Sequence, residues 1–418
     1  MSNLVKLFKH QEEALNETYE KNRVAYYLDM GLGKTFVGSE KLWELNTPYN
    51  LVVCQKSQIS DWKEHFETYY QEYKVIVYEK QSLEIIPPES VLIINYDKAW
   101  RRDELTRLED FTLLLDESSM IKNERSNRSK FVLEKLHPNN VILLSGTPVS
   151  GKYEEIVSQV NLLGWKISKD LFLKQYTERE WDEIDGGYKI VGYKNVDRLK
   201  RKLTKYGAVF MKTEEVFDLP PQNHINVNVK NTKLYKEFSK HHIAEYEGET
   251  IVGDTPASAK MYLRQFAGFM NKNKVQRLKE LIQSTNDRLI VFYNFKKEYE
   301  IISQLCEELE RPVSTVNGQM RDLSAYEEKN NSITLIQYKA GARGLNLQKS
   351  NKIIYFTLTD ESELFEQSKK RTHRIGQDQP CFYYYLLSEG SIEWRMLQVL
   401  KEYKDYTDEL FEKEEVKK

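Results

Sequence analysis

The run Leu-Asp-Met-Gly-Leu-Gly-Lys-Thr at residues 28–35 limits the possible folds of this chain more than any other segment. An apolar patch at 24–28 precedes it, and a segment with helical character at 36–45 follows it. A strand, a glycine-rich loop and a helix N-terminus in this order favour phosphate binding, because the loop N–H groups and the helix dipole both attract negative charge. The alternative is a plain glycine turn before a helix, with a lysine there by chance.

The residue types in this loop suit a nucleotide with its Mg²⁺. Gly31 and Gly33 allow backbone N–H groups to face a phosphate. Lys34 is long enough to reach the β- and γ-phosphates, and the hydroxyl of Thr35 is a ligand for Mg²⁺. The longer form of this pattern has one more glycine, at the position that Leu28 occupies here. The match is therefore to the shorter G-x-G-K-T core.

Length and composition predict a soluble protein of two or three domains. The chain has 418 residues, too many for one compact core. Hydrophobic residues make up 40% and charged residues 30%, and no apolar run is long enough to cross a bilayer. The stretch from Met1 to His10 does not have the pattern of a signal peptide. The three cysteines are widely spaced, which favours a reducing compartment, the cytoplasm, and predicts no zinc site.

The net charge of −2 argues against a dedicated nucleic-acid module, which is often basic overall. A local basic groove can nevertheless lie on a neutral body. Charge alone therefore excludes neither a nucleic-acid-binding protein nor an enzyme of another kind.

Residues 24–164 alternate apolar runs with helical stretches, such as Asp61–Tyr70 and Ser129–Leu136. This alternation predicts a doubly wound α/β fold with a parallel sheet, which binds ligands at the carboxyl ends of its strands. The predicted strands are Ala25–Leu28, Asn50–Cys54, Lys74–Tyr78, Val91–Asn95, Phe111–Leu115 and Val141–Ser145.

The alternation stops at 165–275, a stretch rich in Lys, Glu and Tyr. We expect 165–210 to be a mostly helical insertion in the first lobe. Residues 211–222, with their Pro-Pro pair, are predicted to form an inter-lobe linker. Residues 231–275 are predicted to be a second helical insertion, apart from a loop around Gly253.

A second α/β series follows, so the chain is predicted to have two lobes, 1–210 and 223–418. A helix is expected at Lys296–Glu310, and an amphipathic, highly charged helix at 391–418. Only the first lobe carries a phosphate loop, so the second lobe must have another role. The strands predicted for the second lobe are Arg288–Tyr293, Pro312–Asn317, Ser332–Ile336, Lys352–Phe356 and Cys381–Leu387.

A buried-strand pattern at Phe111–Leu115 ends in two acids, Asp116 and Glu117. In a sheet with a phosphate loop, an aspartate at a strand end can hold Mg²⁺, and a glutamate beside it can act as general base toward the attacking water. The other interpretation is a pair of solvated acids. The phosphate loop upstream in the same lobe favours the catalytic interpretation.

The apolar strand Val141–Leu144 leads into small hydroxyl residues, Ser145 and Thr147. Their side chains could sense a bound phosphate and relay its presence to other parts of the lobe. Without the other motifs, the same segment would indicate only a strand and a turn.

Two segments late in the chain suit a phosphate-rich ligand. Arg371 and Arg374 are three residues apart and would share one face of a helix, from which they could reach a γ-phosphate held by the other lobe. A solvated basic helix is the alternative. In the run 340–347, Gly341 and Gly344 permit close approach of a ligand or a phosphodiester, although a tight turn explains them too.

In order and spacing, these motifs resemble the Swi/Snf-type ATPases of helicase superfamily 2, from about Leu4 to about Leu400. The ending His-Arg-Ile-Gly-Gln at 373–377 is the most specific match. The matching segments are Leu7–Gln11 (the adenine-reading Q motif), Asp29–Thr35 (motif I), Leu51–Cys54 with Ser57 and Trp62 (motif Ia), Ile93–Tyr96 (the next block), Asp116–Glu117 (motif II) before Ile121–Asn123, Ser145–Pro148 (motif III), Lys212–Val216 with Asp218–Pro221 (the inter-lobe segment), Ile290–Phe292 (motif IV), Gly341–Leu347 (motif V) and Arg371–Gln377 (motif VI).

The resemblance implies two RecA-like lobes that clamp one ATP with Mg²⁺ and move along double-stranded DNA, usually without separating its strands. It assigns catalysis to Lys34, Asp116, Glu117, Arg371 and Arg374. It assigns the nucleotide to Gln11, Met30, Gly31, Leu32, Gly33, Lys34, Thr35 and Gly344, and the Mg²⁺ to Thr35 and Asp116. It assigns nucleic-acid contacts to Ser57, Asn95, Ser145, Thr147, Arg343 and Asn346.

Several positions depart from the family pattern. Motif II of the family ends Asp-Glu-x-His, and the histidine links the nucleotide site to motif III, but Ser119 stands at that position here. Gln55 replaces a proline in motif Ia, and Lys370 replaces an aspartate before the first arginine. Thr359–Ser362 replaces a Trp-Asn-Pro segment, so one expected DNA contact has no counterpart. Short helical protrusions and the lack of a histone reader predict a compact bacterial or viral member that acts as a cytoplasmic monomer.

Three functions stay open at this point. The first is a DNA-stimulated ATPase that moves along duplex DNA. The second is a strand-separating helicase that acts on RNA or forked DNA, and single-stranded DNA or RNA stays an alternative partner to duplex DNA. The third is a nucleotide-switched clamp that binds ATP and nucleic acid and uses slow hydrolysis only for release.

Overall fold

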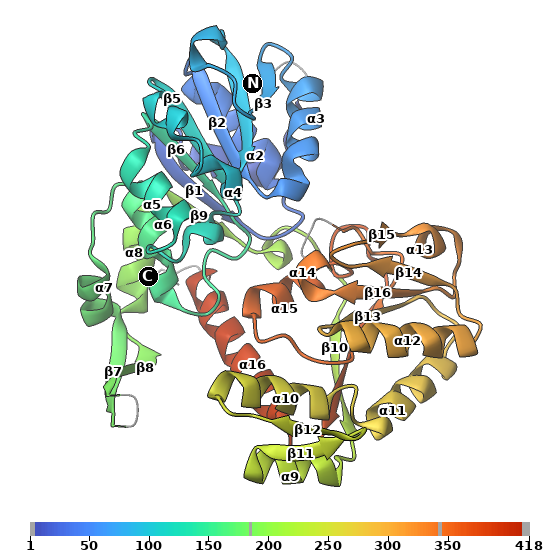
Figure 1. Cartoon of the computed structure of the whole chain (residues 1–418). Coiled ribbons are helices and arrows are strands. Elements are labelled where there is room, and N and C mark those ends of the chain that lie inside the picture. Colours follow the sequence, from blue (N-terminus) through green and yellow to red (C-terminus); the bar gives the residue numbers. More distant parts are fainter. Residues whose placement is uncertain (1–4, 184–185, 342–344, 412–418) are drawn as a thin grey trace, which may run out of the picture. The chain divides into compact units, whose positions relative to one another are not determined.

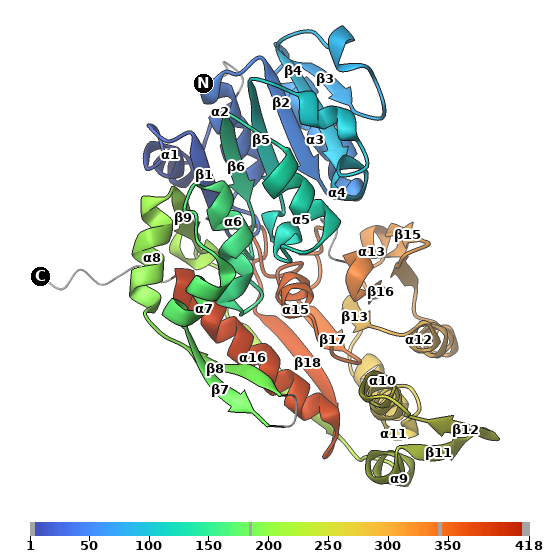
Figure 2. The same ribbon diagram turned by 60° about the vertical axis from the view of Figure 1, so that its left-hand side comes forward.

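The computed structural model describes residues 5–183, 186–341 and 345–411. Contacts divide the chain into two compact units: unit 1 runs to Phe217 and resumes at Asp405, and unit 2 is Asp218–Lys404. Each unit has a seven-stranded, mainly parallel sheet with helices on both faces (Figures 1 and 2). The predicted fold class, two α/β lobes, is confirmed. In the part of the chain described, no helix is both long and apolar enough to cross a membrane.

The sheet of unit 1 consists of β1 (Arg23–Leu28), β2 (Tyr49–Cys54), β3 (Lys74–Val77), β4 (Ser90–Asn95), β5 (Phe111–Asp116), β6 (Asn140–Leu144) and β9 (Ala208–Met211). Its order is β3-β4-β2-β5-β6-β1-β9, and every neighbouring pair is parallel. All the strands predicted for this lobe form. Because β5, β6 and β1 are parallel neighbours, the loops that follow them meet at one edge of the sheet.

The α-helices of unit 1 are α1 (Lys9–Asn16), α2 (Lys34–Leu45), α3 (Ile59–Tyr69), α4 (Tyr96–Ala99), α5 (Asn127–Lys130), α6 (Val157–Leu162), α7 (Lys169–Tyr176) and α8 (Val196–Lys205). Turns of 3₁₀- or π-helix are η1 (Lys56–Gln58), η2 (Leu83–Ile85), η3 (Asp103–Arg107), η4 (Ser118–Ile121), η5 (Phe131–Lys135), η6 (Tyr153–Ile156) and η7 (Thr213–Glu215).

Alternate residues of each strand pack into two separate cores of unit 1. In β1, Ala25 and Tyr27 belong to the core under α4, α6, α7 and α8, whereas Val24, Tyr26 and Leu28 belong to the core under α1, α2 and α3. Burial on both faces is typical of a parallel sheet, and it explains why these strands appear in the sequence as nearly continuous apolar runs. The two layers of helices hold the loops at the sheet edge from both sides.

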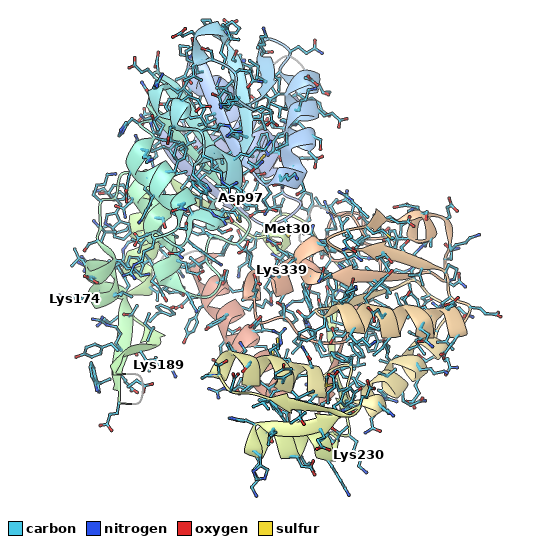
Figure 3. The ribbon with its side chains drawn as sticks, viewed as in Figure 1. Met30, Asp97, Lys174, Lys189, Lys230 and Lys339 are labelled. Carbon is cyan, nitrogen blue, oxygen red and sulfur yellow. The ribbon has the colours of Figure 1, made fainter. Side chains whose placement is uncertain are left out.

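The prediction of a mostly helical insertion at 165–210 is wrong. Between α7 and α8 the chain forms an antiparallel hairpin, β7 (Thr177–Asp182) with β8 (Gly187–Tyr193), and after α8 it adds β9 to the sheet. The hairpin strands are largely exposed and rich in charge, so no apolar alternation marks them. Figure 3 labels Lys174 of α7 and Lys189 of β8, two exposed lysines of this segment.

The sheet of unit 2 consists of β10 (Gln222–Val229), β13 (Leu289–Tyr293), β14 (Val313–Val316), β15 (Arg321–Asp322), β16 (Ile333–Gln337), β17 (Lys352–Tyr355) and β18 (Cys381–Ser388). Its order is β10-β18-β17-β13-β16-β14-β15, and only the short β15 is antiparallel to its neighbour. The strands predicted for this lobe all form. The edge strand β10 is additional, and its alternating polar residues gave no apolar run to detect.

The helices of unit 2 are α9 (Lys233–His241), α10 (Pro256–Ala267), α11 (Lys272–Gln283), α12 (Lys296–Glu308), α13 (Ser324–Glu328), α14 (Tyr338–Gly341), α15 (Ser362–Lys369) and α16 (Ile392–Phe411). Within 231–275, predicted as helical, the chain also forms a hairpin of β11 (Ile243–Tyr246) and β12 (Glu249–Val252), so that prediction is wrong in part. The helix expected at 391–418 is α16, which begins at Ile392 and is described to Phe411.

From Asp405 onward, α16 is counted with unit 1. There the hydroxyl of Tyr153, on η6, lies 2.6 Å from Oε2 of Glu409 and 2.9 Å from the carbonyl oxygen of Tyr406. The ring of Phe411 meets the ring of Phe210 edge to face, with centroids 5.2 Å apart. The end of the helix therefore packs by both polar and aromatic contacts.

A buried ion pair holds the start of α16 in unit 2. Lys274 of α11 and Glu393 of α16 are both buried, and the ammonium of Lys274 donates to Oε1 of Glu393 at 2.5 Å. The other carboxylate oxygen accepts the N–H of Ser388 at 2.9 Å. Burial raises the pKa of Glu393, and the charge of Lys274 opposes that shift.

We expect Lys274→Met to destabilise unit 2 by about 3–5 kcal/mol, because it leaves the Glu393 carboxylate buried without its cation. The double variant Lys274→Met/Glu393→Gln should recover most of that loss, since no buried charge remains. Chemical denaturation of the wild type and both variants measures the difference. Equal losses in the single and the double variant would show that the charge pair is not the cause.

Candidate active site

The loop after β1 has the backbone conformation that its glycines require. Gly31 has φ +91° and Gly33 has φ +75°, both in the left-handed region. A Cβ at Gly33 would lie 2.1 Å from Nε2 of Gln11, so space as well as conformation demands glycine there. Gly33 is also the N-cap of α2. The loop thus opens onto a helix N-terminus, where free N–H groups bind anions.

Lys34 and Thr35 are the first two residues of α2. The ammonium of Lys34 donates to the carbonyl oxygens of Leu28, at 3.0 Å, and Asp29, at 3.2 Å. A Cβ at Gly146, in the loop after β6, would lie 3.2 Å from the same ammonium nitrogen. The loops after β1 and β6 therefore meet around the Lys34 side chain.

Gln11 of α1 reaches the same loop. Its Nε2 donates to the carbonyl of Leu32 at 3.1 Å, and its Oε1 accepts the N–H of Phe8 at 2.9 Å. Nε2 of His10 lies 3.0 Å from the Leu32 carbonyl as well. Met30, labelled in Figure 3, is half-buried in this loop. The residues predicted for motif I and the Q motif are thus gathered at one place.

A cavity of about 390 Å³ adjoins this part of α1. The rings of Phe8 and His10 are stacked, with centroids 5.8 Å apart. The ring of Phe217 stands edge-on to both. A cavity with three aromatic rings suits a flat heterocycle such as a nucleobase. It is lined by Phe8, Lys9, His10, Glu13, Met211, Glu215, Val216 and Phe217.

Asp116, the last residue of β5, is buried in a set of hydrogen bonds. The indole N–H of Trp62 donates to Oδ2 at 2.8 Å, the N–H of Glu117 donates to Oδ1 at 3.1 Å, and the hydroxyl of Tyr96 donates to the Asp116 carbonyl at 3.0 Å. Burial raises the pKa of Asp116, while the Trp62 bond and the charge of Lys34 oppose the shift. The Lys34 cation and this carboxylate therefore act on each other.

Glu117 is held in a strained backbone conformation, with φ +53° and ψ +60°. A residue with a side chain is rare in this left-handed region, and such strain concentrates at functional sites. The hydroxyl of Ser145 donates to Oε2 of Glu117 at 3.4 Å, and the N–H of Thr147 donates to the Ser145 hydroxyl at 3.1 Å. The loop after β5 and the loop after β6 are thus in contact.

Four predicted nucleic-acid residues lie in unit 1, and most are buried. Ser145 is fully buried, Thr147 is 7% exposed and Asn95 is 5% exposed. The Asn95 side chain caps α4 by accepting the N–H of Lys98 at 2.9 Å. Ser57, on η1, is half-buried. Of the four, Ser57 keeps the most exposed surface, although its hydroxyl oxygen is buried.

The predicted shared helix face of Arg371 and Arg374 is wrong. Helix α15 ends at Lys369, and the residues after it form turns. Arg371 is 1% exposed and its carbonyl accepts the N–H of Leu347 at 3.0 Å. Arg374 is half-buried and its guanidinium donates to Oδ1 of Asn346. Motif VI therefore packs on motif V within unit 2.

Gln377, at the C-terminal end of motif VI, holds the turn that follows α15. The amide of Gln377 donates to the carbonyls of Gln348, at 3.0 Å, and Ser350, at 3.1 Å, and Gly376 has φ +90°. These contacts draw the backbone toward motif V, which a continuing helix could not follow. Two other predicted residues, Arg343 and Gly344, lie outside the described residues.

The residues at the edge of the unit 1 sheet fit a nucleotide with Mg²⁺. The helix N-terminus and Lys34 suit phosphates, and the carboxylate of Asp116 with the hydroxyl of Thr35 suits a hard cation. Among the described residues, no three or more acids, histidines or cysteines gather into a metal site. A cation here would therefore take further ligands from phosphates and water, as Mg²⁺ usually does.

Sequence reasoning did not reveal Gln159, and it did not reveal the partners of Trp62 and Thr213. Trp62 is separated from Asp116 by 54 positions, and Gln159 from Ser118 by 41, so no local pattern connects them. Thr213, on η7, donates to Oδ2 of Asp29 at 3.0 Å across 184 positions. Such pairs become visible only when the strands are arranged in space.

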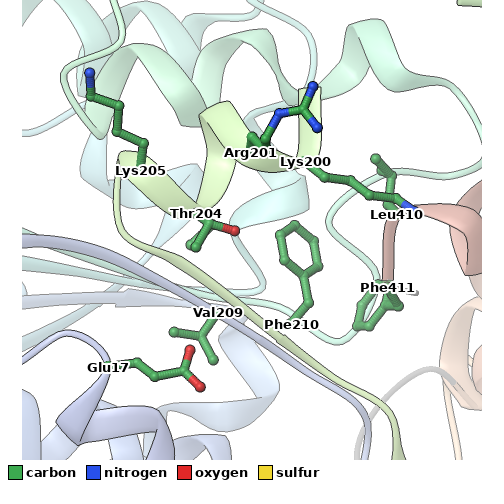
Figure 4. Close-up of a pocket in the computed structure, with 10 residues that line it drawn as sticks. Glu17, Lys200, Arg201, Thr204, Lys205, Val209, Phe210, Leu410 and Phe411 are labelled. Atoms are coloured by element: carbon green, nitrogen blue, oxygen red, sulfur yellow. The ribbon is translucent and has the colours of Figure 1, made fainter. Parts of the chain in front are cut away.

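A second cavity of unit 1, of about 540 Å³, contains none of the predicted site residues. Figure 4 shows Lys200, Arg201 and Lys205 of α8 around it, with Phe210 and Phe411. The C-terminal end of α8 contributes here, and a helix C-terminus disfavours anions. The cavity is lined by Glu17, Lys200, Arg201, Thr204, Lys205, Ala208, Val209, Phe210, Leu410 and Phe411.

Two domain families match the chain. The SNF2-related domain matches residues 10–283, and the Helicase conserved C-terminal domain matches residues 273–376. A "SWI/SNF-related matrix-associated actin-dependent regulator of chromatin subfamily A-like protein 1" of Drosophila melanogaster is 24% identical over 91% of this chain and 53% of that protein. The "Putative ATP-dependent helicase/translocase YwqA" of Bacillus subtilis is 23% identical over 92% of this chain and 46% of that protein.

The chain thus spans about half the length of these curated relatives. A solved structure, "Sulfolobus solfataricus SWI2/SNF2 ATPase core in complex with dsDNA", is 20% identical with a TM-score of 0.45, and covers 97% of this chain and 93% of that one. The SNF2-related match alone covers more than half of the residues. The chain therefore belongs to the SNF2-related family, the Snf2-type ATPases of helicase superfamily 2.

Proposed function

We propose that this protein hydrolyses ATP with Mg²⁺ and uses the hydrolysis to move along double-stranded DNA. The observation that carries the proposal is the contact between three loops at the edge of the unit 1 sheet. Lys34 comes after β1, Asp116 is the last residue of β5, and Gly146 comes after β6. The charge of Lys34 lowers the pKa of Asp116, and Gly146 lies against the Lys34 ammonium. A cation, a buried carboxylate and a helix N-terminus together match the charges of a nucleoside triphosphate with its metal.

Each of these residues has a role in the proposed reaction. The N–H groups after Gly31 and Gly33 and the ammonium of Lys34 bind the phosphates and orient them. Asp116 and Thr35 hold the Mg²⁺, which neutralises charge on the phosphate oxygens. Glu117, held in its left-handed conformation, accepts a proton from the attacking water.

The adenine ring is placed in the cavity beside α1. Gln11 does not line that cavity, but its amide accepts the N–H of Phe8, which does, and donates to the Leu32 carbonyl in the phosphate loop. The stacked rings of Phe8 and His10 supply apolar surface for a base.

Unit 2 completes the site in this proposal. Arg374 stabilises the charge that develops on the γ-phosphate when the two lobes close on ATP. Arg374 is partly exposed and can reach a phosphate more easily than Arg371, which is buried in unit 2. The bond from Arg374 to Asn346 ties this arginine to motif V, so a nucleic acid at motif V could alter its position.

Duplex DNA is proposed as the track because the motifs resemble those of double-stranded DNA translocases and a relative is named a helicase/translocase. Ser57 and Asn346, the more exposed of the described candidates, are the residues assigned to it. Ser145 and Thr147 are buried beside Glu117 and Lys34 and are assigned to sensing the nucleotide instead.

We expect Lys34→Ala and Glu117→Gln to reduce ATP turnover by roughly 10²–10⁴-fold or more, because one removes a phosphate cation and the other the proton acceptor. Glu117→Gln should still bind ATP, since shape and hydrogen bonding change little. Arg374→Ala should also bind ATP and lose roughly 10³–10⁵-fold in hydrolysis. Equilibrium binding and single-turnover hydrolysis measure these effects. Arg395→Ala, at an exposed arginine of α16, is the control, and full turnover in Arg374→Ala would contradict its role.

We expect Trp62→Phe to raise the Mg²⁺ concentration for half-maximal hydrolysis by roughly 10–100-fold, because Asp116 loses the donor that orients its carboxylate. The phenyl ring keeps most of the packing against Phe66. A magnesium titration of ATPase activity measures the shift, and Trp43→Phe in α2 is the matched control. An unchanged magnesium requirement would show that Trp62 only fills space.

The choice of nucleic acid is tested by comparing ATPase rates with duplex DNA, single-stranded DNA and RNA at the same stated salt concentration. We expect the largest stimulation by duplex DNA, and we expect it to weaken as salt increases, because phosphate contacts release counterions. Triplex displacement without unwinding of a forked duplex supports translocation. Unwinding of the fork would favour a strand-separating helicase, and slow turnover with no stimulation would favour an ATP-switched clamp.

A further inference from the structure

The side chain of Gln159, in α6, is fully buried and bonds to three different parts of unit 1. Its Oε1 accepts the hydroxyl of Ser118 at 2.7 Å and the hydroxyl of Tyr27 at 3.0 Å. Its Nε2 donates to the carbonyl of Pro148 at 2.8 Å. Ser118 and Tyr27 are also fully buried. One amide therefore satisfies three polar groups inside the core.

The three partners lie in one strand of the site and in the segments that follow its two neighbouring strands. Ser118 follows Glu117 directly and begins η4. Pro148 ends the motif III run that starts at Ser145, after β6. Tyr27 lies in β1, one residue before the strand ends. In the sheet, β6 lies between β5 and β1, so Gln159 bridges all three at the edge where the phosphate loop begins.

Few other side chains could make this set of bonds. A glutamine amide has an oxygen with two lone pairs and a nitrogen with hydrogens to donate. Glutamate would lose the donor to Pro148, and leucine would lose all three bonds and leave two buried hydroxyl groups to find other partners. Such a fully satisfied buried network fixes the relative position of its members more strictly than apolar packing does.

The helix that carries Gln159 is itself tied to the loop after β5. The hydroxyl of Ser158 donates to the carbonyl of Ile121 at 2.7 Å, at the other end of η4. The two neighbouring residues of α6 therefore hold η4 at its first and its last residue. A displacement of α6 or of Pro148 would move the turn that positions Glu117.

We propose that Gln159 is a positioning residue that links the loop after β6 to Glu117, in the place of the motif II histidine that this chain lacks. The direct bond from Ser145 to Glu117 is long, at 3.4 Å, and weak by its distance. The route through Ser118 and Pro148 consists of shorter bonds and is fully buried. The inference rests on the proposed function, since the effect of the link is to hold Glu117 where it accepts the proton of the attacking water.

The test compares Gln159→Leu with the wild type in three measurements: ATP affinity, ATPase rate without DNA, and ATPase rate with saturating duplex DNA. We expect ATP affinity to be nearly unchanged and both ATPase rates to fall by up to roughly 10²-fold, the effect that a small displacement of a catalytic group can have. A loss of rate without a loss of ATP affinity is not expected from general destabilisation.

Asn161→Leu is the matched control on the same helix. The Asn161 amide donates to the carbonyls of Val157, at 2.8 Å, and Ile167, at 3.0 Å, and touches neither Ser118 nor Pro148. It should lower the unfolding temperature without lowering the ATPase rate. Equal losses of ATPase rate in the two variants would overturn the proposal.

Ser118→Ala provides a second route if Gln159→Leu fails to fold. It removes one donor to Gln159 and should reduce the ATPase rate by itself. Combined with Gln159→Leu it should add little, because both act through one link. Additive losses in this double-mutant cycle would overturn the proposal. A wild type that DNA does not stimulate would instead overturn the proposed function, so the two failures are distinguishable.

Discussion

The site depends on the parallel pairing of β5, β6 and β1. This pairing sets the register, with Thr112 opposite Asn140 and Arg23 opposite Val141, and so it decides which loop residues emerge at the same edge. Hydrophobic burial on both faces stabilises this pairing, because a shift by one residue would exchange the two cores. The polar chemistry at the edge is thus positioned by apolar packing inside the sheet.

Around this edge, the catalytic candidates are held by side chains from other elements. Trp62 of α3 and Tyr96 of α4 both donate to the segment that carries Asp116 and Glu117. Gln159 of α6 approaches the same segment from the second core. Helix α3 packs on one face of the sheet, and α4 and α6 pack on the other. The position of the two acids is therefore set by side chains from both layers of helices.

The sequence was sufficient for the parts of the fold that have a local signal. Long apolar strands, the glycine pattern of the phosphate loop and the acids at the end of β5 were predicted and formed. The hairpin β7–β8 was not predicted because its strands are exposed and rich in charge. The edge strands β9 and β10 were not predicted because they are short or polar and pair with distant segments. The turn after Lys369 was missed because the segment that follows motif V, 27–29 positions earlier in the sequence, holds Gln377 and prevents the helix from continuing.

The backbone of Glu117 has a consequence for the evolution of such a chain. A carboxylate residue with positive φ costs on the order of 1–3 kcal/mol relative to a relaxed backbone, and glycine would remove most of that burden. A sequence selected only for folding stability would therefore tend to have glycine at this position. The glutamate at this position is therefore explained by its role in the reaction and not by stability. Laboratory selection for thermal stability alone would tend to replace it.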